Sequence, residues 1–170
     1  MHQYKKKSNL LFLCYNQIRS DNMKLGIASD HRGYHLKEKI KEAIEDIEIV
    51  DFGTNSEESC DYPDYAFKLG EAVAKKEVDF GIAICGSGIG ISIACNKVKG
   101  VRCAKVSNRE EARITRIDNN SNIVAFKEDV PIDDALNIVY TFINTKFSEE
   151  EKHHRRVDKI TKYEEEHYDR

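Results

Sequence analysis

The residues best suited to chemistry lie in one short stretch, Cys85-Gly86-Ser87-Gly88-Ile89-Gly90, which directly follows an apolar run. Three glycines within five residues let backbone N–H groups converge, because no Cβ prevents close approach or a positive φ. The segment 91–97 can form a helix whose N-terminus favours negative charge. Such surroundings favour the ionised form of a thiol. The stretch therefore predicts a nucleophile or base, Cys85, beside an anion-binding loop.

The glycine loop is not one of the common nucleotide-binding motifs. It lacks the G-K-[ST] ending of a phosphate-binding P-loop, and its third glycine comes one residue too early for the dinucleotide fingerprint. A lone cysteine is more often a small buried apolar residue than a catalyst. The position of Cys85 immediately before the glycines favours the functional interpretation.

Other polar residues lie where ligands could reach them. Asp30 and His31 follow a strand and open a helix, so Asp30 could cap that helix or contact substrate hydroxyls, while His31 could contact an anionic group. Tyr62 precedes a helix and could wall a sugar pocket beside the turn at Pro63. Residues 118–122 form either an asparagine-rich turn or a ligand site. Residues 152–156 form either a solvated basic face or a phosphate clamp.

Strand and helix patterns alternate from residue 24 onward. Strands are expected at residues 25–28, 49–52, 78–85, 101–106 and 123–126, and helices at 36–47, 66–73, 91–97, 108–117 and 131–142. Repeated βα units predict a single-domain α/β fold, a three-layer αβα sandwich with a five-stranded parallel Rossmann-like sheet. Ligands bind at the carboxyl ends of such strands, where residues 29–31, 85–90 and 107–108 should meet.

Composition limits the possible functions. The 170 residues are 40% apolar and 34% charged with a net charge of −3, which favours neither nucleic acid nor a membrane surface as partner. Five cysteines show no zinc-site spacing, so no metal is expected, and their odd number favours reduced thiols in the cytoplasm. We expect a disordered extension over residues 1–22, an α/β domain over 23–147 and a charged C-terminal helix or tail over 148–170.

Several motifs together resemble the ribose-5-phosphate isomerase B family, which includes the galactose-6-phosphate isomerase subunits. The resemblance covers residues 23–160. It rests on Ser29-Asp30-His31-x-Gly33, Asp61-Tyr62-Pro63, Ile84–Lys97, Gly100-Val101-Arg102, Asn119-x-x-Asn122 and His153-x-x-Arg156-Val157.

The resemblance implies cofactor-free interconversion of an aldose phosphate and its ketose through a cis-enediolate, most simply ribose 5-phosphate and ribulose 5-phosphate of the pentose phosphate pathway. Cys85 would be the base that moves the proton, and Ser87 would support its thiolate. The resemblance further assigns the enediolate oxygens to Gly86, Gly88 and Gly90, the sugar to Asp30, Tyr62 and Asn119, and the phosphate to His31, Lys152, His153 and Arg156. It also implies homodimers or homotetramers with sites at the subunit interface.

The chain departs from the family pattern at three positions. Asp118 stands where many members have a histidine thought to open the sugar ring; a carboxylate can accept and return a proton but is a poorer acid. Asp129 and Lys152 replace arginines of the phosphate site. Three other functions therefore stay open: a hexose-phosphate isomerase or its subunit, a non-catalytic module that binds a sugar phosphate or nucleotide, and a thiol-redox protein.

Overall fold

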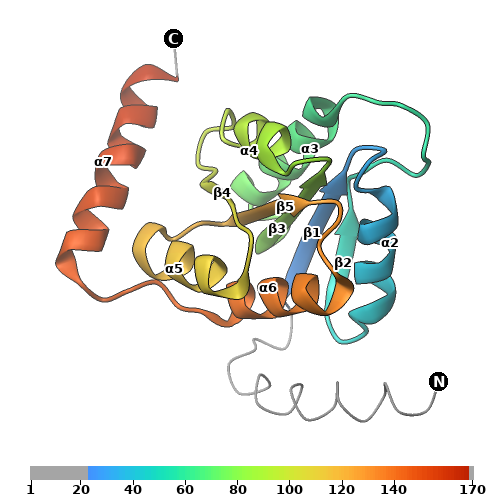
Figure 1. The fold of residues 1–170 in the computed structure, drawn as a ribbon. Helices are drawn as coiled ribbons and strands as arrows, with labels where there is room; N and C mark the ends of the chain where they lie inside the picture. The colour runs from blue at the N-terminus through green and yellow to red at the C-terminus, as the bar shows by residue number, and fades with distance from the viewer. Residues whose placement is uncertain (1–22, 169–170) are drawn as a thin grey trace.

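A parallel sheet forms the centre of the molecule. The computed structural model describes residues 23–168. The strands are β1 (Lys24–Ser29), β2 (Glu48–Asp51), β3 (Phe80–Cys85), β4 (Cys103–Lys105) and β5 (Ile123–Lys127). They pair in the order β2-β1-β3-β5-β4, and every pair is parallel (Figure 1). The predicted five-stranded parallel sheet is confirmed.

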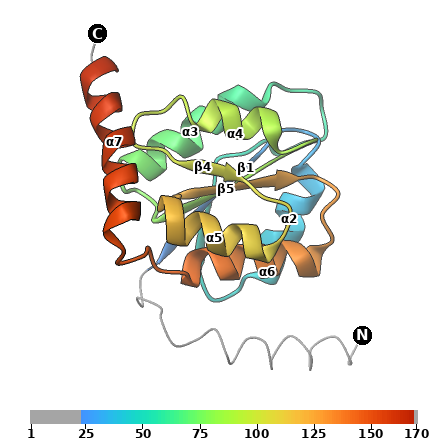
Figure 2. The ribbon, with the colours of Figure 1, turned by 60° about the vertical axis from the view of Figure 1, so that its left-hand side comes forward.

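Helices cover both faces of this sheet. They are α2 (Tyr34–Ala43), α3 (Tyr62–Ala74), α4 (Ile89–Cys95), α5 (Arg109–Asn119), α6 (Ile132–Asn144) and α7 (Glu151–His167). Helices α2, α5 and α6 lie on one face and α3 and α4 on the other, which gives the expected three layers (Figure 2). Helix α7 stands outside these layers and contacts α5.

The apolar strands bury alternate side chains in two cores, because successive residues of a strand point to opposite faces. On β3, Ile82 and Ile84 join the core under α2 and α6, whereas Ala83 and Cys85 join the core under α3 and α4. This alternation decides the position of the thiol. Cys85 faces the layer formed by α3, which starts at Tyr62, and α4, which follows the glycine loop.

Several element boundaries differ from the sequence-based expectation. Helix α2 ends at Ala43, although Ile44 and Ile47 beyond it remain buried. Strand β4 spans only residues 103–105, although Val101 and Val106 on either side are buried. The spacing of apolar residues indicates which side chains are buried, not where an element ends. These flanking residues are buried in the core although they lie outside α2 and β4. Helix α4 begins at residue 89 rather than 91, and Pro131 precedes α6 instead of lying in its first turn.

The C-terminal segment forms a regular helix within the described residues. Helix α7 buries His153, Val157 and Glu164 on one side, and a Glu164 carboxylate oxygen accepts a hydrogen bond from the Gly100 N–H at 3.1 Å. The expectation for residues 1–22 lies outside the described residues. Within residues 23–168, every helix is too short or too polar to cross a bilayer.

Candidate active site

The thiol of Cys85 lies at the carboxyl end of the central strand β3, turned toward the glycine loop. The side chain is only 4% exposed, and its Sγ accepts a hydrogen bond from the Gly88 N–H at 3.2 Å. A backbone donor at this distance stabilises a developing negative charge on sulfur. Cys85 is therefore buried but not enclosed by apolar groups alone.

Two glycines of the loop lie in close contact with neighbouring residues. Gly88 adopts a left-handed conformation with φ of 75°, and a Cβ there would lie 2.7 Å from the carbonyl carbon of Phe126. A Cβ on Gly90 would lie 2.8 Å from Cζ of Tyr62. The loop thus lies close to β5 on one side and to the Tyr62 ring on the other.

Ser87 is exposed beside the loop, and its Oγ accepts a hydrogen bond from the Ile89 N–H at 3.1 Å. This contact fixes the start of α4 and leaves the hydroxyl proton for another acceptor. The role of Ser87 in supporting the thiolate stays a prediction. Helix α4 has only seven residues, so the loop N–H groups rather than a long helix dipole are the donors here.

Asp30 and His31 lie in the turn after β1, which runs beside β3. The buried Asp30 accepts hydrogen bonds at Oδ1 from the Arg32 and Gly33 N–H groups, at 3.0 and 3.1 Å. Its carboxylate thus shapes the turn, while Gly33 rather than Asp30 precedes α2. The half-buried His31 holds Nδ1 3.2 Å from both the N and the O of Cys60. Cys60 thereby fixes the orientation of the ring.

An ion pair that the sequence did not reveal spans the end of β3. Arg32, after β1, binds Glu128, after β5, with Nε 2.9 Å from each carboxylate oxygen. The partners are 96 residues apart, so no local pattern could have joined them. Next to this pair, the exposed Asp129 carboxylate lies 3.0 Å from the Lys127 ammonium, which offsets its charge.

Asp118 and Asn119 lie at the opposite edge of the sheet from Cys85. They end helix α5, which leads into the first residue of β5, and Ile123 there pairs with Gly81. Cys85 instead pairs with Lys127 at the far end of β5. Four residues of strand correspond to about 13 Å. Within one chain, the two predicted groups of site residues are therefore apart.

Helix α7 brings its predicted phosphate ligands to that second group. His153 is 6% exposed and faces α5, where its Nε2 lies 3.7 Å from Oδ1 of Asp118. Lys152 and Arg156 are exposed, and Lys152 pairs with Glu150 at 2.6 Å. Because positions 152 and 156 are one helical turn apart, both cations lie on one side of α7 beside His153.

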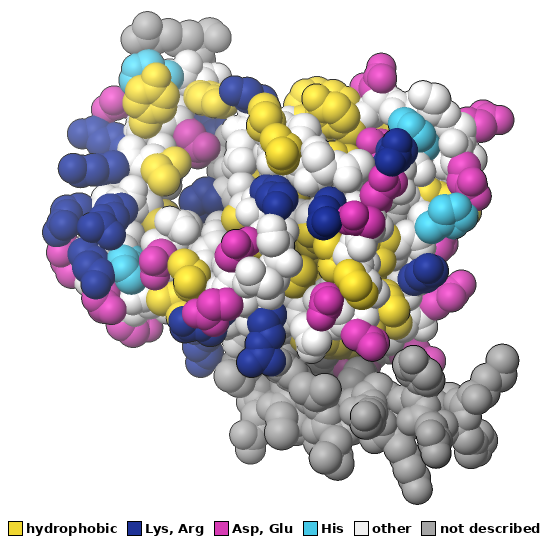
Figure 3. Space-filling view, in the orientation of Figure 1, with side chains coloured by type: hydrophobic (Ala, Val, Ile, Leu, Met, Phe, Trp, Pro, Cys, Tyr) yellow, Lys and Arg dark blue, Asp and Glu magenta, His cyan; other side chains and the backbone are white. Residues whose placement is uncertain are grey.

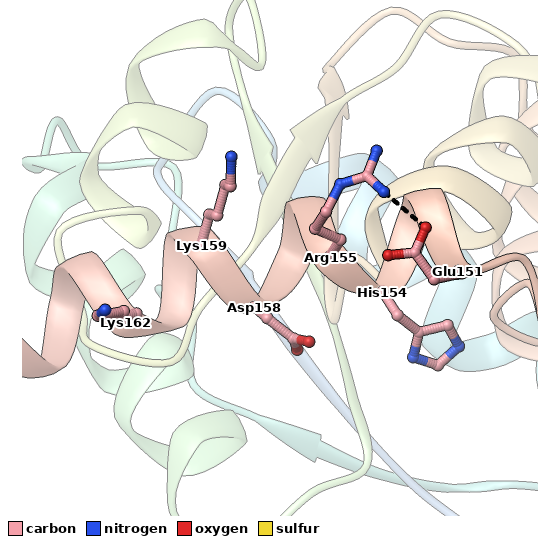
Figure 4. A pocket seen from close by; sticks show the side chains of 6 residues that line it. All are labelled: Glu151, His154, Arg155, Asp158, Lys159 and Lys162. Carbon is pink, nitrogen blue, oxygen red and sulfur yellow. Dashed lines mark hydrogen bonds and ion pairs between the residues drawn. The ribbon is translucent and has the colours of Figure 1, made fainter.

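An open pocket of about 370 Å³ lies along α7 rather than at the glycine loop. It is lined by Glu151, His154, Arg155, Asp158, Lys159 and Lys162 (Figure 4). Arg155 pairs with Glu151 at 2.5 Å, one turn apart on the same helix. None of the glycine-loop residues lines this pocket. No cluster of three metal-ligating side chains occurs within residues 23–168.

Comparison with known proteins identifies the family. Residues 25–160 match the family model described as Ribose/Galactose Isomerase. The chain belongs to this isomerase family. A protein of Bacillus subtilis strain 168 that bears the name "Putative sugar phosphate isomerase YwlF" is 45% identical over 148 residues, which are 84% of this chain and 98% of that protein. The isomerase resemblance seen in the sequence motifs is confirmed.

Solved structures of isomerase relatives share the fold. Ribose-5-phosphate isomerase B of Clostridium thermocellum is 46% identical with a TM-score of 0.81, covering 85% of this chain and 99% of that one. Ribose-5-phosphate isomerase B of Mycoplasma genitalium, solved with bound ribulose-5-phosphate, is 38% identical with a TM-score of 0.80, covering 86% and 99%.

Proposed function

We propose that the protein interconverts ribose 5-phosphate and ribulose 5-phosphate through a cis-enediolate, with Cys85 as the base. The observation that carries this proposal is the contact between the Cys85 Sγ and the Gly88 N–H at 3.2 Å, at the end of the central strand of an isomerase fold. The names of the relatives support ribose 5-phosphate as the substrate.

The chemistry follows from the weak acidity of the sugar carbon. The Cys85 thiolate takes the proton from C2, the proton of the 2-hydroxyl passes to O1, and the sulfur returns its proton to C1, so that the carbonyl moves from C1 to C2. The negative charge on the enediolate oxygens exists mainly in the transition state and the intermediate, so donors placed beforehand act where they lower the barrier. Removal of one such donor typically costs roughly 3–4 kcal/mol. We assign that role to the N–H groups of the loop 86–90 other than those of Gly88 and Ile89, which already donate to Cys85 Sγ and Ser87 Oγ.

The reaction needs no cofactor, because the proton only changes carbon and no electrons leave the sugar. The described cysteines Cys60, Cys85, Cys95 and Cys103 are free thiols, which suits a reducing compartment such as the cytoplasm. The remaining roles are those that the family resemblance gives. Asp30 and Tyr62 hold the sugar, and His31 binds the phosphate.

A complete site requires two copies of the chain. The residues near Cys85 and the group around Asp118 and Asn119 lie at opposite edges of one sheet. In a dimer, the Cys85 group of one subunit and the Asp118 group of the other would together form one active site. A two-fold dimer produces two such sites at once. Apolar side chains on α3 and α4 offer a contact surface: Phe67 is 40% exposed, Ile89 54% and Ile93 55% (Figure 3). In this homodimer, Asn119, Lys152 and Arg156 reach the substrate of the partner.

A panel of aldose phosphates tests the proposed function. Purified protein is mixed with ribose 5-phosphate, galactose 6-phosphate, glucose 6-phosphate and arabinose 5-phosphate, and ketose formation is followed. We expect the highest kcat/KM with ribose 5-phosphate. Faster turnover of a hexose phosphate would identify a hexose-phosphate isomerase. Thermal stabilisation by a sugar phosphate without any ketose would identify a binding module.

A further inference from the structure

Asp118 and His153 form a contact that their separation in the chain did not suggest. Asp118 lies near the end of α5, and His153 is the first buried residue of α7. The imidazole Nε2 is 3.7 Å from Oδ1 of Asp118. The other ring nitrogen, Nδ1, is buried and has no hydrogen-bond partner among the described residues. The imidazole therefore has one polar neighbour on its Nε2 side, and its Nδ1 is buried without a partner among the described residues.

This environment favours one tautomer of the ring. A neutral imidazole carries its proton on one nitrogen and a lone pair on the other. A proton on Nδ1 would be buried without a hydrogen-bond acceptor, which is costly. A proton on Nε2 points toward a carboxylate. The neutral form of His153 thus presents its N–H donor to Asp118, and a slight approach makes a hydrogen bond.

The other charges near this pair have closer partners. Arg113, five residues before Asp118 on α5, makes a two-point contact with Glu110 at 2.7 and 2.9 Å. Glu150, which precedes α7, pairs with Lys152. Asp118 keeps a 45% exposed side chain, so its carboxylate can reach a ligand while one oxygen faces the imidazole.

We propose that His153 is a positioning residue for Asp118, and that the two act together when the furanose ring of the substrate opens. The proposal rests on the proposed function. It changes the role of His153 from a phosphate ligand to a group that fixes the Asp118 carboxylate through Nε2–H. Lys152 and Arg156, which are exposed on the same side of α7, remain for the phosphate.

The ring-opening step needs one proton to change place. The Asp118 carboxylate accepts the proton of the 1-hydroxyl, the C1–O4 bond breaks, and its electron pair remains on O4. Asp118 then gives the proton to O4, and a carbonyl remains between C1 and O1. The Nε2 proton of His153 stays on the ring throughout and keeps one carboxylate oxygen occupied. The other oxygen is left to carry the proton between O1 and O4.

A substrate that cannot close its ring separates this role from phosphate binding. Ribose 5-phosphate is compared with its 4-deoxy analogue, which lacks the hydroxyl that forms the furanose. For His153→Leu we expect kcat/KM to fall at least about tenfold with ribose 5-phosphate, because positioning is lost. The 4-deoxy analogue should be isomerised within about twofold of the wild-type rate, since the remaining site is intact.

Two matched variants control this comparison. His153→Gln places an amide donor near the position of Nε2, and we expect it to restore most of the activity on ribose 5-phosphate. His154→Leu removes the adjacent imidazole, whose Nε2 lies 2.8 Å from the Ser148 carbonyl oxygen, and should leave both substrates unaffected. If His153→Leu does not fold, His153→Gln and Asp118→Asn carry the test. Asp118→Asn should slow ribose 5-phosphate selectively, and ¹⁵N NMR should show the His153 proton on Nε2.

The outcomes distinguish this proposal from the proposed function. Equal losses on both substrates would make His153 a phosphate or structural residue and overturn the proposal, as would a proton on Nδ1. Failure of the wild-type protein to isomerise either substrate would refute the proposed function itself. A selective loss of kcat/KM on ribose 5-phosphate in His153→Leu, which His153→Gln largely restores, supports the proposed action of His153 on Asp118.

Discussion

At the scale of single residues, the glycine loop could be predicted from the sequence, but its contacts with distant residues could not. Its spacing predicted backbone donors beside Cys85, because only glycine permits such a loop. The reason for Gly88 in particular became visible only in three dimensions, since Phe126 of β5 lies against it. A Cβ at Gly90 would meet only the outer atoms of the Tyr62 side chain, which can move, so this second constraint is weaker. Contacts between distant strands and helices leave no local pattern, so these two constraints could not be predicted.

Gly88→Ala tests the close approach of the loop to β5. Gly100 provides a matched control, because its φ is 83° but a Cβ would meet nothing closer than 4.0 Å. A left-handed alanine costs roughly 1–2 kcal/mol at either position. Gly88→Ala should lose more stability than that and most of its activity, whereas Gly100→Ala should remain active. Chemical denaturation and isomerase assays measure both, and equal behaviour of the two variants would contradict the account.

At the scale of elements, the contacts that join α2 to β2 were not visible in the sequence. Lys37 is completely buried, yet its ammonium lies 2.5 Å from Asp51, and Lys41 lies 2.7 Å from the same carboxylate. The helical pattern predicted α2 but treated Lys37 as an ordinary polar position. Its burial depends on the pairing of β2 with β1, which brings Asp51 at the end of β2 into contact with Lys37 of α2.

Asp51→Asn tests this network and its dependence on pH. Burial alone would raise the pKa of Asp51, but hydrogen bonds from Lys37 and Lys41 hold that pKa below its ordinary value. A lowered pKa stabilises the fold above the unfolded-state pKa of about 3.9, and this contribution is lost as pH falls through the folded value. Near pH 7 the variant should lose about 3 kcal/mol of unfolding free energy, because Lys37 keeps a buried charge with one partner fewer.

The pH series supplies the control for this prediction. The stability difference between wild type and Asp51→Asn should be full above about pH 5 and shrink as pH falls below about pH 4. Glu71→Gln, which breaks the exposed Lys75–Glu71 pair, should change stability by less than about 1 kcal/mol at any pH. A difference that does not depend on pH would rule out the ion pair as its source.

At the scale of the whole molecule, alternating strands and helices were enough to predict the layers and the parallel sheet. They were also enough to place residues 29–31 and 85–90 at one edge of it. Because α5 leads into β5, the alternation also implies that Asp118 and Asn119 lie at the opposite edge, but it could not show which helix packs beside them. Nor could it show that α7 brings the buried His153 against α5.

Mixing two inactive variants tests whether each site is shared between subunits. One variant is Cys85→Ala, and the other combines Asp118→Ala with Arg156→Ala. When the two are co-expressed with different tags, half of the dimers are mixed, and each mixed dimer has one intact site. We expect activity to return to about a quarter of the wild-type value. An inactive mixed dimer, isolated with both tags, would place each site within one chain.

The central claim is that the Cys85 sulfur removes the proton from C2 of the sugar. The direct measurement is exchange of that proton with solvent deuterium in ribose 5-phosphate, followed by NMR. Cys85→Ala should lower the exchange rate by at least about a hundredfold while the substrate still raises the melting temperature. Cys60→Ala, a thiol change beside His31 that keeps the backbone N–H, should exchange at nearly the wild-type rate. Unchanged exchange in Cys85→Ala would contradict the account.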